Sequence, residues 1–183
     1  MPDGTRVTLR HLRLDEVRSF YDALTMAIRS SAGYGLDELP SISYFVRWYV
    51  NDFHNIVYEL TATGQTIAYT NFGESPFSRS SASKLTDGNM VILPEWRSKK
   101  WFRHLSMINF AKENVLMTAG QGETAIVNLA SLKVSLQFGY IVNGVLPKGI
   151  YFKDHGWMDL VMYYRPADAV TEEKNENQNK SKI

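Results

Sequence analysis

Residues 87–115 read DGNMVILPEWRSKKWFRHLSMINFAKENV, and the predicted architecture follows from this segment. Its apolar run Met90–Leu93 has the length of one buried strand. Pro94 ends that strand, because proline cannot donate to a strand ladder and disfavours helical geometry in the residue before it. A basic loop follows, and apolar residues then recur at the three- and four-residue spacing of a helix; they are Trp101, Leu105, Ile108, Ala111 and Val115.

The order strand, basic loop, helix N-terminus predicts an anion-binding site. The first turn of a helix has free backbone N–H groups, and the helix dipole adds positive potential there. Cations at that end cost a few tenths of a kcal/mol up to about 1 kcal/mol. Arg97, Lys99 and Lys100 in this loop therefore indicate an anion that compensates them. The alternative is a solvated loop whose lysines extend into water.

Length and composition indicate one globular domain. The chain has 183 residues, of which 44% are hydrophobic and 13% aromatic, enough to bury a core. We expect residues 1–166 to form this domain. Residues 167–183 have almost no apolar content, so we expect a disordered polar tail.

Charge and residue types exclude several function classes. Twenty basic and 19 acidic residues give a net charge of +1, so neither nucleic acid nor membrane is an expected partner. No segment approaches the ~18 apolar residues of a membrane span, and the N-terminus lacks a signal-peptide core, so we expect a soluble cytoplasmic protein. Cysteine is absent and the four histidines are dispersed, so no metal site is predicted.

Periodicity along the chain predicts an α/β (α+β) fold with a mixed sheet and helices on both faces, in the order β-α-α-β-β-β-α-β-α-β-β. Predicted strands are 5–10, 55–61, 65–72, 90–93, 124–127, 140–146 and 160–164. Asp15, Ser41 and Asn128 are predicted to cap helices, and Gly139 to end one. Three glycine-bearing segments are interpreted as turns or loops: Asp87–Gly88, Gly120–Gly122 and Pro147–Asp159.

The segment Ile92–Phe102 resembles the acetyl-CoA segment of the GNAT superfamily of N-acyltransferases, in which the loop reads R/Q-x-x-G-x-G/A. Arg97 fits the opening position, whereas Lys100 and Phe102 stand where the family has small residues. Asn128–Ser131 with Phe138–Tyr140 resembles the family's N-x-x-A/S…G-F/Y helix and exit strand. The resemblance extends over roughly residues 5–165 and implies a GNAT-like acyl-CoA N-acyltransferase fold.

This resemblance implies acetyl-CoA as co-substrate. The pyrophosphate would contact side chains and amides of the basic segment, namely Arg97, Ser98, Lys99, Lys100, Trp101 and Phe102. Ile92 and Leu93 would pair their backbone with the pantetheine arm, opposite Ile126–Val127 across a split in the sheet. Asn128 and Ser131 would contact the cofactor, and Asn128 also fits a helix cap.

Acyl transfer to an amine needs a base for the ammonium and an acid for the leaving thiolate. Asp87 is the best-placed base, although an Asp-Gly turn explains it as well, and Glu59 is the second candidate. Ser135 stands at the position where many family members have a tyrosine that acts as the general acid. The thiolate can also leave with only a water or backbone donor.

The family position of the acceptor pocket implies two groups of substrate-binding residues. The first group lies between the first two helices, where an aromatic face and carboxylates would recognise an ammonium: Tyr34, Asp37 and Glu38. The second group lies near the last hairpin: Tyr151, His155, Trp157 and Asp159. Each of these residues alone is equally explained by a structural role.

We therefore predict an acetyl-CoA-dependent N-acetyltransferase acting on a primary amine of a small molecule. The rival hypothesis is a catalytically inactive GNAT-fold binding or assembly module. Lys100, Phe102 and Ser135 favour this rival, and Trp101 or Phe102 would then fill the cofactor cleft. A homodimer is left open.

Overall fold

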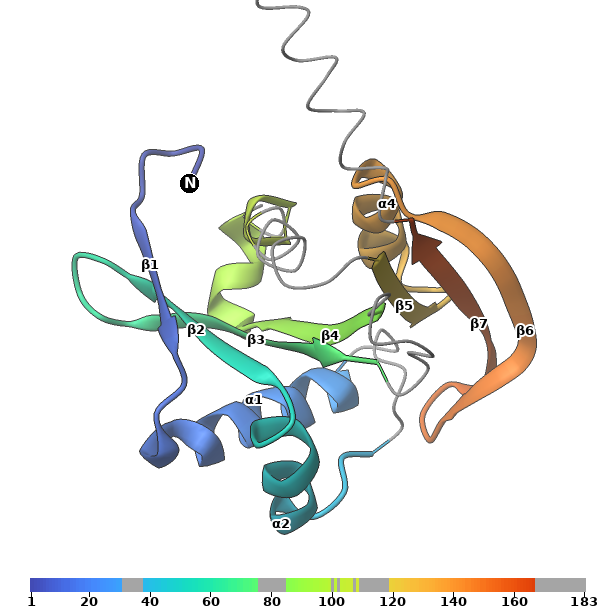
Figure 1. Cartoon of the computed structure of the whole chain (residues 1–183), viewed down its shortest axis with the longest axis horizontal. Helices are drawn as coiled ribbons and strands as arrows, with labels where there is room; N and C mark the ends of the chain where they lie inside the picture. The colour runs from blue at the N-terminus through green and yellow to red at the C-terminus, as the bar shows by residue number, and fades with distance from the viewer. Residues whose placement is uncertain are drawn as a thin grey trace, which may run out of the picture.

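The computed structural model describes residues 1–30, 38–75, 85–99, 101, 103–106, 108 and 119–166. In these ranges seven strands form one sheet in the order β1-β2-β3-β4-β5-β7-β6 (Figure 1). All neighbouring strands are antiparallel except β4 and β5, which are parallel. The strands are β1 (Val7–His11), β2 (His54–Leu60), β3 (Thr66–Glu74), β4 (Leu85–Ile92), β5 (Ala119–Ala125), β6 (Ile141–Phe152) and β7 (Gly156–Arg165).

Helices cover both sides of this sheet, so the predicted fold class is confirmed. Figure 1 shows α1 and α2 on one side and α4 on the other. The α-helices are α1 (Val17–Ser30), α2 (Ile42–Phe45) and α4 (Leu129–Gln137). Residues 103–106 and 108, after β4, are also helical. Shorter helical turns are η1 (Leu14–Glu16), the π-helical turn η2 (Val46–Val50) and η3 (Pro94–Lys99). No helix in the described ranges is long and apolar enough to cross a membrane.

Separate apolar clusters fill the two sides of the sheet. Phe20, Ile28 and Phe45 of α1 and α2 pack with Tyr69 and Val91 on one side. On the other side, the residues after β4 pack over β2, β3 and β4; this cluster contains Ile56, Tyr58, Ala68, Ile92, Trp101 and Leu105. β4 is therefore held by apolar contacts on both sides.

The sheet splits between β4 and β5. The two strands pair only through Leu85 with Ala119 and Thr86 with Gly120. Beyond these pairs β4 continues along β3 as far as Ile92, while β5 continues along β7 as far as Ala125. Two adjacent parallel strands thus separate after one shared end, as the resemblance to the GNAT superfamily implies.

Several predicted turns are wrong, because pairing with neighbouring strands overrides the local preference of glycine. Asp87 and Gly88 lie inside β4, opposite Gly73 and Phe72. Gly120–Gly122 lies inside β5, paired with β7. The predicted loop 147–159 is mostly strand, because β6 extends to Phe152 and β7 begins at Gly156, with irregular pairing between Leu146 and Ile150.

The structure confirms three of the four predicted helix-end residues and contradicts one. The Ser41 side chain accepts a hydrogen bond from the Tyr44 N–H, and Asn128 accepts one from Ser131. Gly139 has a φ of 80°, the left-handed geometry that favours glycine at a helix end. Asp15 caps nothing: it lies within η1, whose N-cap is Arg13.

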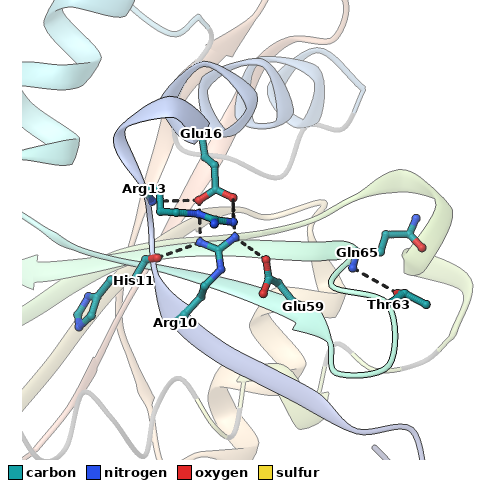
Figure 2. A network of polar contacts seen from close by, with 7 residues as sticks. All are labelled: Arg10, His11, Arg13, Glu16, Glu59, Thr63 and Gln65. Carbon is teal, nitrogen blue, oxygen red and sulfur yellow. Dashed lines mark hydrogen bonds and ion pairs between the residues drawn. The ribbon is translucent and has the colours of Figure 1, made fainter.

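A charged network joins β1, η1 and β2 at the edge of the sheet (Figure 2). The Arg10 guanidinium lies between the carboxylates of Glu16 and Glu59 and pairs with both. Its Nη1 is 2.7 Å from Glu16 Oε2. The hydrogen bonds from Arg10, with smaller contributions from Arg13, lower the pKa of Glu16 from 4.5 to about 2.

Replacing Arg10 by glutamine is expected to lower the free energy of unfolding by about 2–3 kcal/mol near neutral pH. This is less than the roughly 3–4 kcal/mol that the Glu16 shift corresponds to, because Arg13 contributes to that shift and solvent screens the pair. Because the folded-state pKa of Glu16 is depressed, this contribution is complete above pH 4.5 and is lost as the pH falls towards 2. Denaturant unfolding of the wild type and the variant at several pH values from about 2 to 7 measures this contribution to the free energy of unfolding. Arg18→Gln, which breaks an exposed ion pair with Asp22, is the control and should cost less than about 0.5 kcal/mol. Equal losses in the two variants would contradict the prediction.

Candidate active site

Backbone groups of β4 face the split. The Leu93 N–H donates to the Ile67 carbonyl of the β3 side at 3.0 Å. Directions alternate along an antiparallel strand, so the N–H and C=O groups of Ile92 point away from β3. The Ile92 carbonyl accepts a hydrogen bond from Arg97 Nε, and the Gly88 N–H donates to the Asp87 carboxylate. The Ile92 N–H is therefore the donor directed to the split. Ile92 lies beyond the two residue pairs that join β4 to β5. The split therefore presents a strand edge to which an extended amide-containing chain can add.

Asp87 is the first residue of β4 past the paired end. It shares a face of β4 with Val91, which packs against α1, so its carboxyl lies on the α1 side of the sheet. The Gly88 N–H donates to its Oδ1 at 2.7 Å. Burial raises the pKa of Asp87, and this hydrogen bond opposes the shift. A carboxyl with a raised pKa at a split in a sheet fits a proton acceptor.

Glu123 of β5 lies on the same side of the sheet as Asp87. Gly120 pairs with Thr86, so alternation places Gln121 and Glu123 on the face of Asp87. Glu123 is exposed, yet partial desolvation of its carboxyl raises its pKa, and the negative charge of Asp87 adds to the shift. Two interacting carboxyl groups therefore flank the split on the α1 side.

A buried phenol lies on the opposite side of the split. Tyr163 of β7 pairs with Gly122 of β5, and its ring occupies the space over that glycine: a Cβ at Gly122 would be 2.4 Å from Tyr163 Cε2. Burial raises the pKa of Tyr163, against the effect of hydrogen bonds with Ser135 and Ser131. Ser135, the predicted acid, is itself buried on α4. The structure thus brings a tyrosine of strand β7 to Ser135 of helix α4.

The basic segment after β4 is mostly a helical turn, η3, rather than an open loop. Arg97 reaches back to β4: its Nε donates to the Ile92 carbonyl at 3.0 Å, and its Nη1 is 3.5 Å from Ser30 Oγ. Arg97 therefore lies at the open end of the split. Lys100 and Phe102 fall outside the described residues, as do the side chains of Ser98 and Lys99.

Trp101 does not fill the split. Its side chain is 3% exposed and packs with Ile92 and Leu105 over β2–β4. It stacks on Trp96 with ring centroids 5.5 Å apart, and its Nε1 donates to Asp3 at 3.2 Å. A cofactor contact of Trp101 would therefore involve its backbone and not its ring.

The residues predicted to line the acceptor pocket do not all come together. Glu38 and His155 line a cavity of about 310 Å³ between α1 and the β6–β7 turn. Tyr151 instead packs edge-on against Trp157 at 5.4 Å, on the face of β6 opposite Phe152, which lines the cavity. Tyr34 and Asp37 fall outside the described residues.

Two further predicted site residues have structural partners. Asp159 Oδ1 accepts a hydrogen bond from the Lys148 N–H at 2.9 Å, which holds the irregular part of β6. Glu59 is ion-paired with Arg10 on β1, and β3 separates its strand from β4. The Glu59 carboxylate is therefore engaged by Arg10 on a strand that does not border the split, which makes Asp87 the better candidate for the base.

Glu123 and Tyr163 were missed by the sequence analysis. Glu123 follows Gly120–Gly122, which was interpreted as a loop, and Tyr163 lies in an apolar run that fits a buried strand. Alternation along β7 places Tyr163 on the same face as Val161, but only the pairing with β5 brings it to the split. No local signal identifies that pairing.

The fold is that of known acetyltransferases. An N-acetyltransferase from Staphylococcus aureus has a TM-score of 0.74 at 16% identity and covers 89% of this chain and 99% of its own. A GNAT superfamily phosphinothricin acetyltransferase from Sinorhizobium meliloti, in complex with acetyl-CoA, has a TM-score of 0.70 at 18% identity, covering 87% and 88%. A ribosomal-protein-alanine N-acetyltransferase from Brucella melitensis has a TM-score of 0.70 at 17% identity, covering 87% and 99%.

The sequence itself matches no protein-family model and no curated protein. At these identities the likeness to solved structures shows the fold alone. The chain has the GNAT superfamily acyl-CoA N-acyltransferase fold.

Proposed function

We propose that this protein is an acetyl-CoA-dependent N-acetyltransferase that acts on a primary amine of a small molecule. The observation that carries the proposal is the split between β4 and β5, which has a carboxyl on one side and a buried phenol on the other. A similar fold with acetyl-CoA bound supports the choice of co-substrate.

The residues at the split fit the pantetheine arm of acetyl-CoA. The Ile92 N–H is directed to where that arm would add as a strand. Arg97 lies at the open end of the split, and its guanidinium, which carries five N–H donors, would bind the phosphates. Acetyl-CoA supplies the acyl group as a thioester.

Asp87 acts as the general base in this proposal. An amine reaches the site as an ammonium ion, and only its neutral form is a nucleophile. The ionised Asp87 carboxylate accepts one proton, and its raised pKa makes it a stronger acceptor than an ordinary aspartate. Glu123, exposed on the same side, is placed to pass this proton to water.

Tyr163 acts as the general acid. Attack by the amine nitrogen on the thioester carbon forms the carbon–nitrogen bond and then breaks the carbon–sulfur bond, and the departing sulfur takes a proton from Tyr163. The nitrogen loses its second proton to solvent, and a proton from solvent restores the Tyr163 hydroxyl, so the reaction releases one proton in all. Because burial raises the pKa of Tyr163, its hydroxyl stays protonated near neutral pH and can donate. Base and acid lie on opposite sides of the sheet, so amine entry and thiol departure do not compete for the same space.

One observation favours the rival function, a catalytically inactive binding module. Tyr44 and Trp48 expose 46% and 47% of their surface on the helix after Ser41, with ring centroids 5.8 Å apart. Exposed aromatic residues are typical of contact surfaces. A protein of this kind would have no need of acetyl-CoA, so cofactor binding distinguishes the two functions.

Thermal unfolding with and without acetyl-CoA tests the proposed function. A ligand at about 100 times its dissociation constant adds about 2.7 kcal/mol to the stability of the folded state. For a chain of this size that shift raises the Tm by roughly 5–10 °C. Adenosine diphosphate, which lacks the pantetheine arm, is the control and should give a smaller shift. No change at millimolar acetyl-CoA would contradict the proposal.

A further inference from the structure

One cavity of the described structure, lined by Glu38 and His155, lies on the α1 side of the sheet. It has a volume of about 310 Å³. Its other charged lining residues are Arg29 at the end of α1 and Lys153 and Asp154 in the β6–β7 turn. The backbone of this turn is closed by a hydrogen bond from the His155 N–H to the Phe152 carbonyl at 3.1 Å.

The packing of the walls places this cavity over the split. Ile28 on the α1 wall belongs to the same apolar cluster as Val91 of β4. Phe152 on the opposite wall packs with Ala125 of β5 and Leu160 of β7. The cavity therefore bridges the elements that cover the two separated strands, on the side where Asp87 and Glu123 lie.

Charges of both signs line the cavity. Glu38 and Asp154 are anionic, and Arg29 and Lys153 are cationic. A simple amine or a polyamine carries positive charge alone, so it can pair with Glu38 and Asp154 but makes no favourable contact with Arg29 and Lys153. An arginine with a lysine is instead a suitable pair for a carboxylate or a phosphate, through charge-assisted hydrogen bonds.

We propose that the acceptor is a zwitterion, a primary amine that also carries an anionic group, with Arg29 and Lys153 binding the anionic group. Glu38 and Asp154 then face the ammonium end as it approaches the carboxyls at the split. This inference rests on the proposed acetyltransferase function and adds the chemical class of the acceptor to it.

Matched pairs of amines test the inference on the full chain. Tyrosine and tyramine differ in a carboxylate, which only tyrosine has. Phosphoethanolamine and ethanolamine differ in a phosphate, which only phosphoethanolamine has. We expect kcat/KM for at least one anionic member to exceed that of its partner by about 10-fold, the effect of hydrogen bonds to a charged group. The pair with the larger ratio identifies the anion.

The double variant Arg29→Gln, Lys153→Gln is expected to remove this preference by raising KM for the anionic amine. The kcat/KM of the amine without the anion should not fall, because Arg29 and Lys153 make no favourable contact with it, and the acetyl-CoA-induced Tm shift should persist. Arg47→Gln, on η2 outside the cavity, is the matched control. Acetyl transfer that is equal within each pair, or faster for the amine without the anion, would overturn the inference and leave the transferase function intact. A missing acetyl-CoA shift would instead overturn the proposed function.

Discussion

Replacing Asp87 by asparagine is expected to lower kcat for amine acetylation by about 100- to 10,000-fold, the range for loss of a general base. Asparagine keeps the shape of the side chain and an oxygen for the Gly88 N–H, but it cannot take a proton. It also removes the cost of burying a charge, so the Tm should not fall. Steady-state kinetics with saturating acetyl-CoA and the Tm of the variant are the measurements.

The pH profile gives the Asp87 prediction a second readout. A base works only when ionised, and the pKa of Asp87 is raised. The kcat/KM of the wild type should therefore fall on acidification at a higher pH than an ordinary aspartate, with a pKa of about 4, would cause. Asp87→Asn should lose this limb, while Asp52→Asn, at an exposed carboxyl, should retain it. If the activity of Asp87→Asn is within a few-fold of the wild type, another group removes the proton from the ammonium.

Replacing Tyr163 by phenylalanine is expected to lower kcat by about 100-fold, the lower end of the range for an acid catalyst. The ring stays against Gly122 and keeps its packing, so the loss isolates the hydroxyl. Ser135 and Ser131 lose a hydrogen-bond partner, which costs about 1 kcal/mol of stability. Acetyl-CoA affinity and the KM of the amine should remain near wild type.

The control for Tyr163 is Tyr151→Phe. Tyr151 is 44% exposed and packs on Trp157 in the β6–β7 hairpin, so its hydroxyl should not affect kcat. Equal activity of Tyr163→Phe and wild type would assign protonation of the thiolate to water or to a backbone group. A loss of acetyl-CoA binding in Tyr163→Phe would indicate a structural and not a catalytic role.

The central unit of the fold was predictable because its signals are local. Met90–Leu93 is apolar, Pro94 ends the strand, and Trp101 and Leu105 recur at helical spacing, so strand and helix both follow from the segment itself. The same holds for the Ser41 and Asn128 caps, whose side chains bind amides within three residues.

The remaining parts depend on contacts between distant segments. Asp87–Gly88 and Gly120–Gly122 have the composition of turns, yet β3 and β7 pair with them and make them strands. Glu59 resembles a free carboxylate until Arg10, 49 residues away, is placed beside it. The pairing of Tyr163 with Gly122 likewise exists only once β7 has paired with β5.

Amide hydrogen exchange with and without acetyl-CoA tests most directly whether the split between β4 and β5 is the cofactor site. We predict that saturating acetyl-CoA slows exchange of the Ile92 amide by about 10-fold or more, because the pantetheine arm pairs with this edge of β4. The Val57 amide in β2, away from the split, serves as the internal reference. Protection that is absent from β4, or no larger there than at Val57, would contradict the assignment of the split as the site of acetyl transfer.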